Sequence, residues 1–237
     1  MRLDPNISVF FPCYNDSNSI GQLVIDSFST LKKITTKFEV IVIDDCSTDN
    51  SRKILEKLET EYKKLKIIHH ATNKGYGGAL QSGFRNAMYE WIFYTDGDGQ
   101  YDVKKLPLLV ALTSDKVDFV NGIKIARKDP TYRLIAGNVY SFLIRWLFWT
   151  PIHDIDCDFR LIRKKIIDKI TLKSTSGSIC VELVKKAQRA GAKFQEVGVP
   201  HFERRWGNSQ FFRPRRIFQT LCELFILWIN LVVLKRN

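Results

Sequence analysis

Two carboxylates stand one glycine apart in this chain, an arrangement suited to holding a metal ion. Asp96 and Asp98 directly follow the apolar run 91–95, and Gln100 comes two residues later. Carboxylates this close repel each other unless a cation lies between them. A ligand set made only of oxygen atoms suits Mg²⁺ or Mn²⁺ better than zinc. The pattern predicts a divalent metal site whose open positions a substrate diphosphate can fill.

Polar clusters follow three other apolar runs of the sequence. They are the segments 13–16, 44–45 and 73–78. Asn, Asp and Gly favour turns, so each cluster taken singly is also consistent with ordinary turn chemistry. Four clusters after four apolar runs are better explained by one shared site.

The elements that must position these clusters alternate between strands and helices. Apolar and β-branched runs predict strands at 7–12, 38–44, 65–69, 91–95 and 117–122. Helical spacing of apolar residues predicts helices at 19–33, 48–64 and 78–90. This alternation indicates an α/β fold with a mostly parallel sheet and helices on both faces. Ligands of such sheets bind beyond the carboxyl ends of the strands, where the polar clusters stand.

The glycine-rich segment 73–83 does not match the common nucleotide-binding motifs. A dinucleotide motif starting at Gly75 needs glycine at position 80, where Leu80 stands, and no P-loop motif occurs anywhere in the chain. We expect these glycines to let a loop and a helix N-terminus pack close to the metal site.

Composition excludes several classes of protein. The chain has 237 residues, of which 45% are hydrophobic and 26% charged, so disordered and low-complexity classes are excluded. Its five cysteines form no CxxC pair, which predicts neither a zinc site nor a disulfide framework and favours a reducing cytoplasm. The first residues lead into an apolar strand without a signal-peptide core, so export is not expected.

The net charge of +12 lies entirely in the second half of the chain. Residues 1–123 hold 15 Lys/Arg and 16 Asp/Glu, a net charge of −1, whereas residues 124–237 hold 22 and 9, a net charge of +13. This asymmetry predicts that the second half meets an anionic partner. Nucleic acid is one candidate, but long apolar runs among the basic residues favour an anionic membrane surface or lipid head group.

Two further segments combine apolar and basic residues. The segment 134–150 is rich in aromatic residues and follows several basic ones, which favours a helix at the water–lipid boundary over an ordinary core helix. The segment 217–234 has 14 apolar residues among 18 and a narrow polar stripe, formed by Gln219, Glu223 and Asn230. The stripe favours a helix that lies in the interface or pairs with another copy, with a helix docked on the catalytic domain as the alternative.

Six segments, in order, resemble the motifs of the family 2 glycosyltransferases. They are Val9–Asp16, Val40–Asp49, Asn73–Gly78, Tyr94–Gln100, Asp154–Leu161 and His201–Ser209. Within that family, the chain looks most like the dolichol-phosphate mannose synthases and the bacterial polyprenyl-phosphate glycosyltransferases.

The resemblance implies a GT-A fold, a nucleotide-sugar donor and roles for individual residues. The residues that it places at the donor are Pro12, Tyr14 and Asp16 in the nucleoside pocket, Asp45 at the base, and Asp96, Asp98 and Gln100 at the metal on the diphosphate. Two positions depart from the family pattern. Asp16 replaces the usual glutamate, and Asp158 stands where the family commonly has glycine, which changes the charge of the acceptor loop.

We therefore expect an inverting, metal-dependent hexosyltransferase that uses a UDP- or GDP-sugar and a polyprenyl phosphate, dolichyl or undecaprenyl, at the cytoplasmic face of a membrane. A lipid phosphate is mostly ionised at neutral pH and can attack without a general base. Arginine holds phosphate well, and the candidate phosphate-binding residues are Arg127, Arg133, Arg160 and Arg204, with Ser209 as a supporting donor. We expect a catalytic domain over 1–212, divided at 123 into donor and acceptor halves, and a helix over 213–237.

Two alternatives remain open at this point. A saccharide acceptor, as in surface polysaccharide synthesis, requires a carboxylate base, and the candidates are Asp154, Asp156 and Glu182. A membrane-bound subunit that binds nucleotide sugar without turnover is the other, although the intact pair Asp96 and Asp98 argues against it.

Overall fold

A computed structural model describes residues 5–125, 131–204, 206 and 214–236, with residues 131–136, 138 and 214 described by their backbone alone. Within this part of the chain a seven-stranded sheet has the order β3-β2-β1-β4-β6-β5-β7. The strands are β1 Ile7–Cys13, β2 Phe38–Asp44, β3 Leu65–His69, β4 Trp91–Thr95, β5 Phe119–Ile125, β6 Phe159–Arg163 and β7 Phe194–Pro200.

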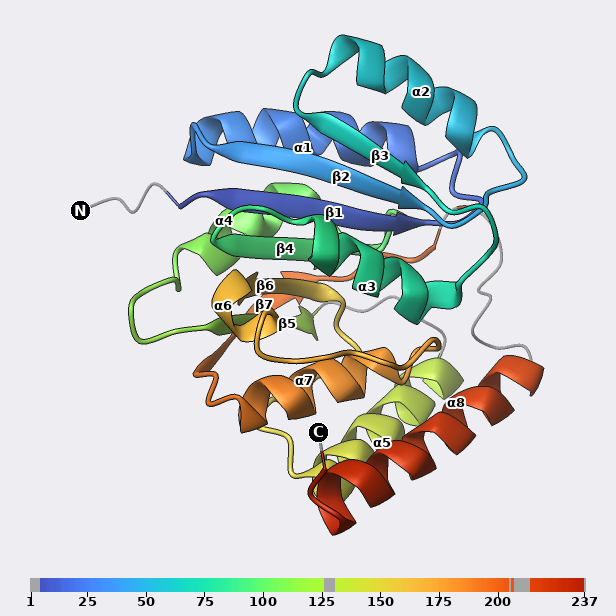
Figure 1. Cartoon of the computed structure of the whole chain (residues 1–237), viewed down its shortest axis with the longest axis vertical. Helices are drawn as coiled ribbons and strands as arrows, with labels where there is room; N and C mark the ends of the chain where they lie inside the picture. Colours follow the sequence, from blue (N-terminus) through green and yellow to red (C-terminus); the bar gives the residue numbers. More distant parts are fainter. Residues whose placement is uncertain (1–4, 126–130, 205, 207–213, 237) are drawn as a thin grey trace.

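Helices cover both faces of the sheet (Figure 1). They are α1 Ile20–Ile34, α2 Ser51–Glu61, α3 Gly75–Asn86, α4 Leu106–Val110, α5 Thr131–Phe148, α6 Lys164–Ile167, α7 Ile179–Arg189 and α8 Pro214–Trp228. Short 3₁₀ and π-helical segments, Val103–Lys105 and Ile229–Val233, precede α4 and follow α8. One apolar core lies under α1, α2 and α4, and a second lies under α3, α5, α6, α7 and α8. The chain therefore has the α/β architecture that the alternating pattern predicts.

Parallel pairing brings the four predicted strand ends to one edge of the sheet. β1 pairs in parallel with both β2 and β4, and β2 pairs in parallel with β3. Apolar, β-branched residues fill these strands because both faces are buried by helices. The segments that follow β1, β2, β3 and β4 consequently share one edge, as expected.

Two strands, β6 and β7, were not among the predicted elements. β6 runs antiparallel to both β4 and β5, with Thr95 opposite Phe159. This reversal places the segment before β6, rather than the one after it, at the same edge as the end of β4.

The start of α3 differs from the prediction of a helix over 78–90. The helix begins at Gly75, where φ is +75°, and the backbone N–H of Gly77 donates to the carbonyl of Thr175 at 3.0 Å. The glycine-rich pattern predicts a loop before residue 78. These glycines are helical here because the helix packs directly against another backbone segment.

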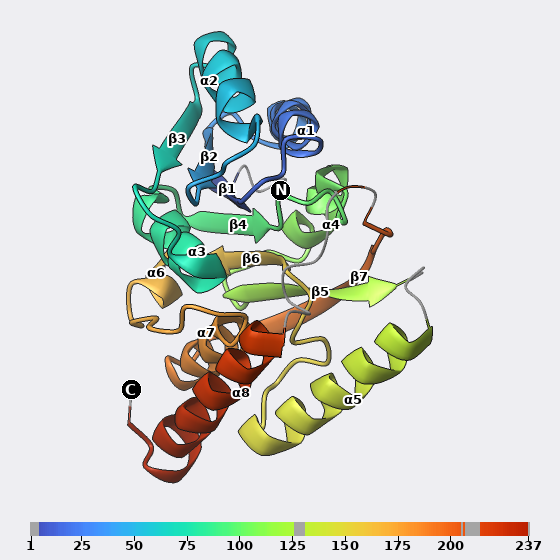
Figure 2. The same ribbon diagram turned by 90° about the vertical axis from the view of Figure 1, so that its right-hand side faces the viewer.

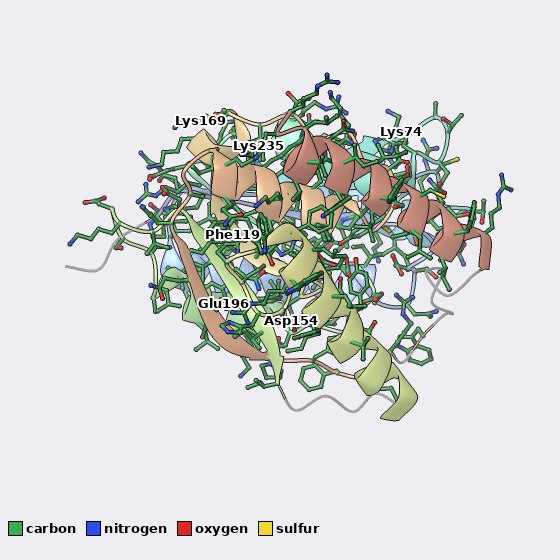
Figure 3. All side chains as sticks on the ribbon, turned by 90° about the horizontal axis from the view of Figure 1, so that it is seen from below. Lys74, Phe119, Asp154, Lys169, Glu196 and Lys235 are labelled. Atoms are coloured by element: carbon green, nitrogen blue, oxygen red, sulfur yellow. The ribbon has the colours of Figure 1, made fainter. Side chains whose placement is uncertain are left out.

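The helices α5 and α8 lie side by side on one side of the molecule (Figure 2). The indole N–H of Trp228 donates to the carbonyl of Leu147 at 3.2 Å. Viewed from below, the two helices lie on the same side of the molecule as α7 (Figure 3). The predicted boundary at residue 212 lies outside the described residues and stays a prediction.

Candidate active site

The loops after β1 and β2 are tied together by Asn15, which has a positive φ of 60°. Its side-chain Oδ1 accepts hydrogen bonds from the backbone N–H groups of Thr48 at 2.7 Å and Asp49 at 3.3 Å. In return, Asp49 Oδ2 accepts from the backbone N–H of Ser17 at 3.0 Å. Asparagine tolerates the left-handed conformation, which lets its side chain bridge the two loops. Pro12 lies near the end of β1, and Tyr14 lies in the loop that follows it.

Asp16 closes this part of the site next to the metal-binding candidates. Its Oδ2 accepts from the backbone N–H of Tyr14 at 3.1 Å, and its own N–H donates to the Ser51 hydroxyl at 3.0 Å. Burial and the charge of Asp98 raise the pKa of Asp16 to about 6, against the opposing effect of the Tyr14 hydrogen bond. The glutamate-to-aspartate departure therefore leaves a short carboxylate fixed in place by its neighbours.

Asp45 is buried and is oriented by groups that the sequence did not single out. Its Oδ1 lies 2.8 Å from the backbone N of Lys74 and 2.6 Å from His70 Nδ1, and His70 Nε2 lies 2.9 Å from the Ser82 hydroxyl. Asp45 Oδ2 has no hydrogen-bond partner within the described ranges. One carboxylate oxygen is thus held by the protein, and the other can accept from a nucleobase N–H.

The two carboxylates after β4 have different partners. Asp96 Oδ1 accepts from the Tyr76 hydroxyl at 2.8 Å. Asp98 Oδ1 accepts from the backbone N–H of Gln100 at 3.0 Å, and Asp98 Oδ2 accepts from the guanidinium of Arg204. The structure therefore brings Asp96, Asp98 and Arg204 together, and it adds Tyr76, which stands inside the glycine-rich motif but has no predicted role.

This arrangement fits a divalent cation on electrostatic grounds. Burial, followed by the charges of Asp158 and Asp98, raises the pKa of Asp96 well above the usual range of an aspartate. A cation relieves this repulsion between carboxylates. Within the described residues, no cluster of three or more His, Cys, Asp or Glu side chains could hold a metal. Asp96 and Asp98 would supply two carboxylates, Gln100 is the third predicted ligand, and the remaining ligands would come from substrate and water.

Gln100 ties the turn after β4 to the segment after β7. Its side-chain Nε2 donates to the carbonyl of Phe202 at 3.0 Å, and the Phe202 N–H donates to the Gln100 carbonyl at 2.9 Å. Tyr101 and His201 form an isolated antiparallel bridge beside this contact. These bonds bring Arg204 to Asp98, so the structure gives Gln100 a bracing role in addition to its predicted place at the metal.

The guanidinium of Arg160 is fully buried. It donates to Asn121 Oδ1 at 2.9 Å, to the Tyr94 hydroxyl at 2.7 Å and to the carbonyl of Ile155. Each of the three guanidinium nitrogens thus donates to a protein acceptor in this structure. This geometry favours a role in positioning its neighbours, because a direct phosphate contact would require the guanidinium to be rearranged.

Asp158, the second departure from the family pattern, lies in the same buried cluster. Its Oδ1 lies 3.7 Å from Arg160 Nη1, and it accepts from the Tyr94 hydroxyl at 3.3 Å and the Cys180 thiol at 3.1 Å. The additional negative charge is therefore partly balanced by an arginine and two hydrogen-bond donors.

The three candidate bases have different environments. Asp154 pairs with Lys124 Nζ at 3.2 Å and lies close to Glu196 (Figure 3). Burial raises the pKa of Asp156 to about 6, with Lys124 opposing it and Asp154 adding to it. Glu182 is fully buried and not a solvated side chain, because it accepts from the backbone N–H groups of Lys173 and Ser174. Of the three, Glu182 is committed to holding a loop.

Three predicted phosphate contacts are not fully placed by the structure. Arg127 and Ser209 lie outside the described residues, and Arg133 is described only as part of the backbone of α5. Their roles stay predictions.

Comparison with known proteins identifies relatives over most of the chain. The sequence model of glycosyl transferase family 2 matches residues 8–171. The undecaprenyl-phosphate 4-deoxy-4-formamido-L-arabinose transferase of Pectobacterium atrosepticum is 28% identical over 208 residues, which cover 87% of this chain and 62% of that protein. The Proteus mirabilis enzyme of the same name is 28% identical over 86% of this chain and 62% of its own length. The chain thus spans less than two thirds of these curated relatives.

Solved structures share the fold at lower sequence identity. Glucosyl-3-phosphoglycerate synthase from Mycobacterium tuberculosis, in complex with Mn²⁺, UDP and glucosyl-3-phosphoglycerate, has a TM-score of 0.70 at 17% identity, covering 95% of this chain and 79% of that one. A complex of the same enzyme with Mn²⁺, UDP-glucose and phosphoglyceric acid has a TM-score of 0.69 at 15% identity, with the same coverage of both chains.

Proposed function

This chain belongs to glycosyl transferase family 2 and has a GT-A-like fold. From that premise we propose that it is a glycosyltransferase that transfers a hexose from a nucleotide sugar to a polyprenyl phosphate. The names of the curated relatives support undecaprenyl phosphate as the acceptor class. The UDP and Mn²⁺ complexes of the structural neighbour support a UDP-sugar, with a GDP-sugar as the second choice, and Mn²⁺ or Mg²⁺ as the cofactor.

The observation that carries the lipid acceptor is a surface of exposed apolar side chains on α5 and α8, which we call the apolar face. Its members are Val139, Phe142, Leu143, Trp146 and Trp149 from α5 and its end, and Phe218, Leu221, Phe225 and Ile226 from α8. Exposed tryptophan and phenylalanine side chains on helices are typical of membrane-interface contacts. Arg145 and Arg215, both exposed, add positive charge that attracts anionic lipid head groups.

The orientation of α8 favours a helix lying in the membrane plane. Arg215–Val233 is long and apolar enough to cross a membrane by length and composition, with a mean hydropathy of 1.6. However, its residues Leu224 and Leu231 are buried against the domain, and Glu223 binds a loop of that domain. We propose that α8 is docked on the domain on one side and immersed in the cytoplasmic interface on the other.

The chemistry follows from the charges around β4. Asp96 and Asp98 would hold the divalent cation, which when bound neutralises the departing diphosphate. Asp45 orients the nucleobase, and Arg204 provides a second positive charge at the diphosphate. The ionised lipid phosphate attacks the anomeric carbon from the side opposite the diphosphate, the bond from that carbon to the diphosphate oxygen breaks, and the configuration inverts. Alignment supplies much of the rate because no proton has to be removed from the acceptor.

A saccharide acceptor is the second candidate, and Asp156 is the observation that favours it. A hydroxyl acceptor must lose a proton, and a carboxylate with a pKa of about 6 is well matched to accepting one near neutral pH. Loss of most of the transfer rate in Asp156→Asn would support this acceptor class.

The test is transfer of radiolabel from a panel of UDP- and GDP-sugars into an organic-extractable product. The reaction contains membranes, added polyprenyl phosphate and Mn²⁺ or Mg²⁺, with Asp98→Ala and EDTA as controls. We expect a lipid-linked product that both controls abolish. Label found only in water-soluble saccharide would instead support the second candidate. Nucleotide binding without transfer from any donor would contradict both and indicate a non-catalytic subunit.

A further inference from the structure

The polar stripe of α8 contacts the catalytic domain. Glu223 Oε2 accepts from the Ser176 hydroxyl at 2.7 Å, from the Ser176 backbone N–H at 3.3 Å and from the Ser178 hydroxyl, and Glu223 Oε1 accepts from the Thr175 hydroxyl at 3.1 Å. These partners belong to residues 173–178, which we call the 173–178 loop. One carboxylate of α8 therefore binds three hydroxyl-bearing residues of this loop, Thr175, Ser176 and Ser178.

Glu223 is suited to this role because it remains ionised. Burial opposes ionisation, but hydrogen bonds from Ser178, Ser176 and Gln219 outweigh it and lower the pKa of Glu223. Hydrogen bonds to a charged acceptor are stronger than those between neutral groups. The carboxylate thus holds the loop more tightly than a neutral amide could.

The other side of the 173–178 loop holds the first turn of α3. Gly77 N donates to the carbonyl of Thr175 at 3.0 Å, and Gln81 Nε2 donates to the carbonyl of Ser174 at 2.9 Å. A Cβ atom at Gly77 would lie 2.2 Å from the Ser174 oxygen, and one at Gly75 would lie 2.7 Å from the Thr175 oxygen. The loop and the helix are therefore in direct backbone contact, so a shift of one displaces the other.

Tyr76 stands between these two glycines, and its hydroxyl donates to Asp96 Oδ1 at 2.8 Å. The contacts form a continuous series from α8 through the 173–178 loop and the start of α3 to the carboxylate after β4. α3, α7 and α8 lie on the same side of the sheet (Figure 1). Glu223 is the one acidic residue of α8.

We propose that Glu223 is a positioning residue for Asp96, acting through the 173–178 loop and Tyr76. Docking of α8, the helix that we place in the membrane interface, thereby orders the carboxylate that holds the metal on the donor diphosphate. The proposal rests on the proposed function for the identity of that ligand. It adds a dependence of the donor site on the C-terminal helix.

Glu182 also holds the 173–178 loop, so we expect removal of the Glu223 carboxylate to have only a local effect. Glu182 of α7 accepts from the backbone N–H groups of Lys173 and Ser174, and it pairs with Lys186 Nζ at 2.7 Å. Removing the Glu223 carboxylate releases the second half of the loop while the first half stays held. The sheet keeps its packing, so the variant remains folded.

Hydrogen exchange tests this connection without any ligand. In the full chain in detergent, we expect Glu223→Gln to raise amide exchange about tenfold in both 174–178 and 75–78, while β1 and β2 keep their protection. Cys222→Ser, which changes the exposed neighbouring residue on the same helix, should leave both segments unchanged. Faster exchange in 174–178 alone, or in neither segment, would overturn the proposal.

Ligand binding tests the consequence for the metal site. By calorimetry, we expect Glu223→Gln and Tyr76→Phe each to weaken Mn²⁺-dependent UDP binding about fivefold and the double variant to lose no more than the larger single effect. Uridine, which lacks the diphosphate, should bind equally to all of them. Additive losses, unchanged Mn²⁺–UDP affinity in Glu223→Gln, or an equal loss of uridine affinity would each contradict the coupling.

These measurements need neither a lipid acceptor nor turnover. A chain that binds Mn²⁺–UDP as described but transfers no sugar to polyprenyl phosphate would overturn the proposed function and leave the role of Glu223 standing. If the chain binds Mn²⁺–GDP instead of Mn²⁺–UDP, the same variants are compared with GDP and guanosine, and metal-dependent binding of neither diphosphate would overturn the proposal.

Discussion

The guanidinium of Arg204 donates to the carboxylate of Asp98 and joins the segment after β7 to the turn after β4. The side chain of Asp98 is 7% exposed and that of Arg204 is 26% exposed, so the pair is partly shielded from water. Shielding strengthens the attraction between opposite charges. Because Asp98 is also a candidate metal ligand, the arginine lies where a metal-held diphosphate would place its negative charge.

Replacing Arg204 with alanine should lower kcat about 100-fold, because it removes one positive charge from the leaving diphosphate. Steady-state transfer assays at saturating donor measure this loss. Arg204→Lys should recover part of the rate, since it keeps the charge and loses the paired geometry. Equal rates for parent and Arg204→Ala would place the leaving group elsewhere.

Replacing Asp98 with asparagine should abolish the response to divalent metal, because one of the two carboxylates is lost. We expect transfer to fall at least about 100-fold. The measurement is a titration of rate against Mn²⁺ concentration. Glu56→Gln is a matched control, since Glu56 is exposed and pairs with Arg52 on α2. A normal Mn²⁺ response in Asp98→Asn would exclude Asp98 from the metal site.

Replacing His70 with asparagine should raise KM for the nucleotide sugar, because His70 bonds to Asp45 and helps to orient it toward the base. A loss of about 1 kcal/mol corresponds to about a fivefold increase, with kcat unchanged. His69→Asn provides the comparison, since His69 lies 2.7 Å from Asp44 instead. If both variants change KM equally, the effect is one of general stability.

Replacing Asp156 with asparagine should stabilise the protein above pH 6. Burial raises the pKa of folded Asp156 from 3.8 to about 6, so between these values the folded state holds more protons than the unfolded one. Stability from this group is therefore present below about pH 4 and is lost as the pH rises to about 6. We expect Asp156→Asn to add up to about 3 kcal/mol at neutral pH, and less at about pH 4. Denaturant unfolding at the two pH values measures the difference, and an equal change at both would exclude the linkage.

Replacing Trp146 or Phe225 with glutamate should weaken binding to anionic vesicles about tenfold or more, because each places a charge in the apolar face. Sedimentation with vesicles containing anionic lipid measures the bound fraction. Ile25→Glu makes the same change on α1, at a residue that is 39% exposed on the other side of the sheet, and should bind normally. Equal losses for all three variants would indicate a general effect of charge.

The residues that we assign to the donor could be placed together from the sequence, because their positions follow from the succession of strands along the chain. Parallel strands place their carboxyl ends at one edge, so Asp45, Asp96 and Asp98 could be assigned to one site before the structure was known. Tyr76 could not, because a tyrosine between glycines reads as loop, and its approach to Asp96 depends on contact with Thr175, far along the chain.

The other side of the site was less predictable because burial gives charged residues partners that the sequence does not show. Arg160 looks like a phosphate ligand in sequence, yet its partners Asn121 and Tyr94 lie on two neighbouring strands that enclose it. Glu182 is a candidate base in the sequence, but two backbone amides bind it inside the domain. The partners of Arg160 come from the pairing of β6 with β4 and β5, and those of Glu182 come from a loop that packs back on α7; local patterns specify neither.

The antiparallel course of β6 also determines which parts of the candidate site can change independently. Its amino end, Phe159, lies opposite Thr95 at the end of β4, so the stretch 150–158 reaches the edge that carries Asp96 from a strand outside the parallel group of β1, β2 and β3. Substitutions or insertions in this stretch leave β1, β2 and β3 untouched. On the proposed function, the fold therefore allows the acceptor side of the site to vary while the donor side is kept, and Asp158 is a position where such a change would fall.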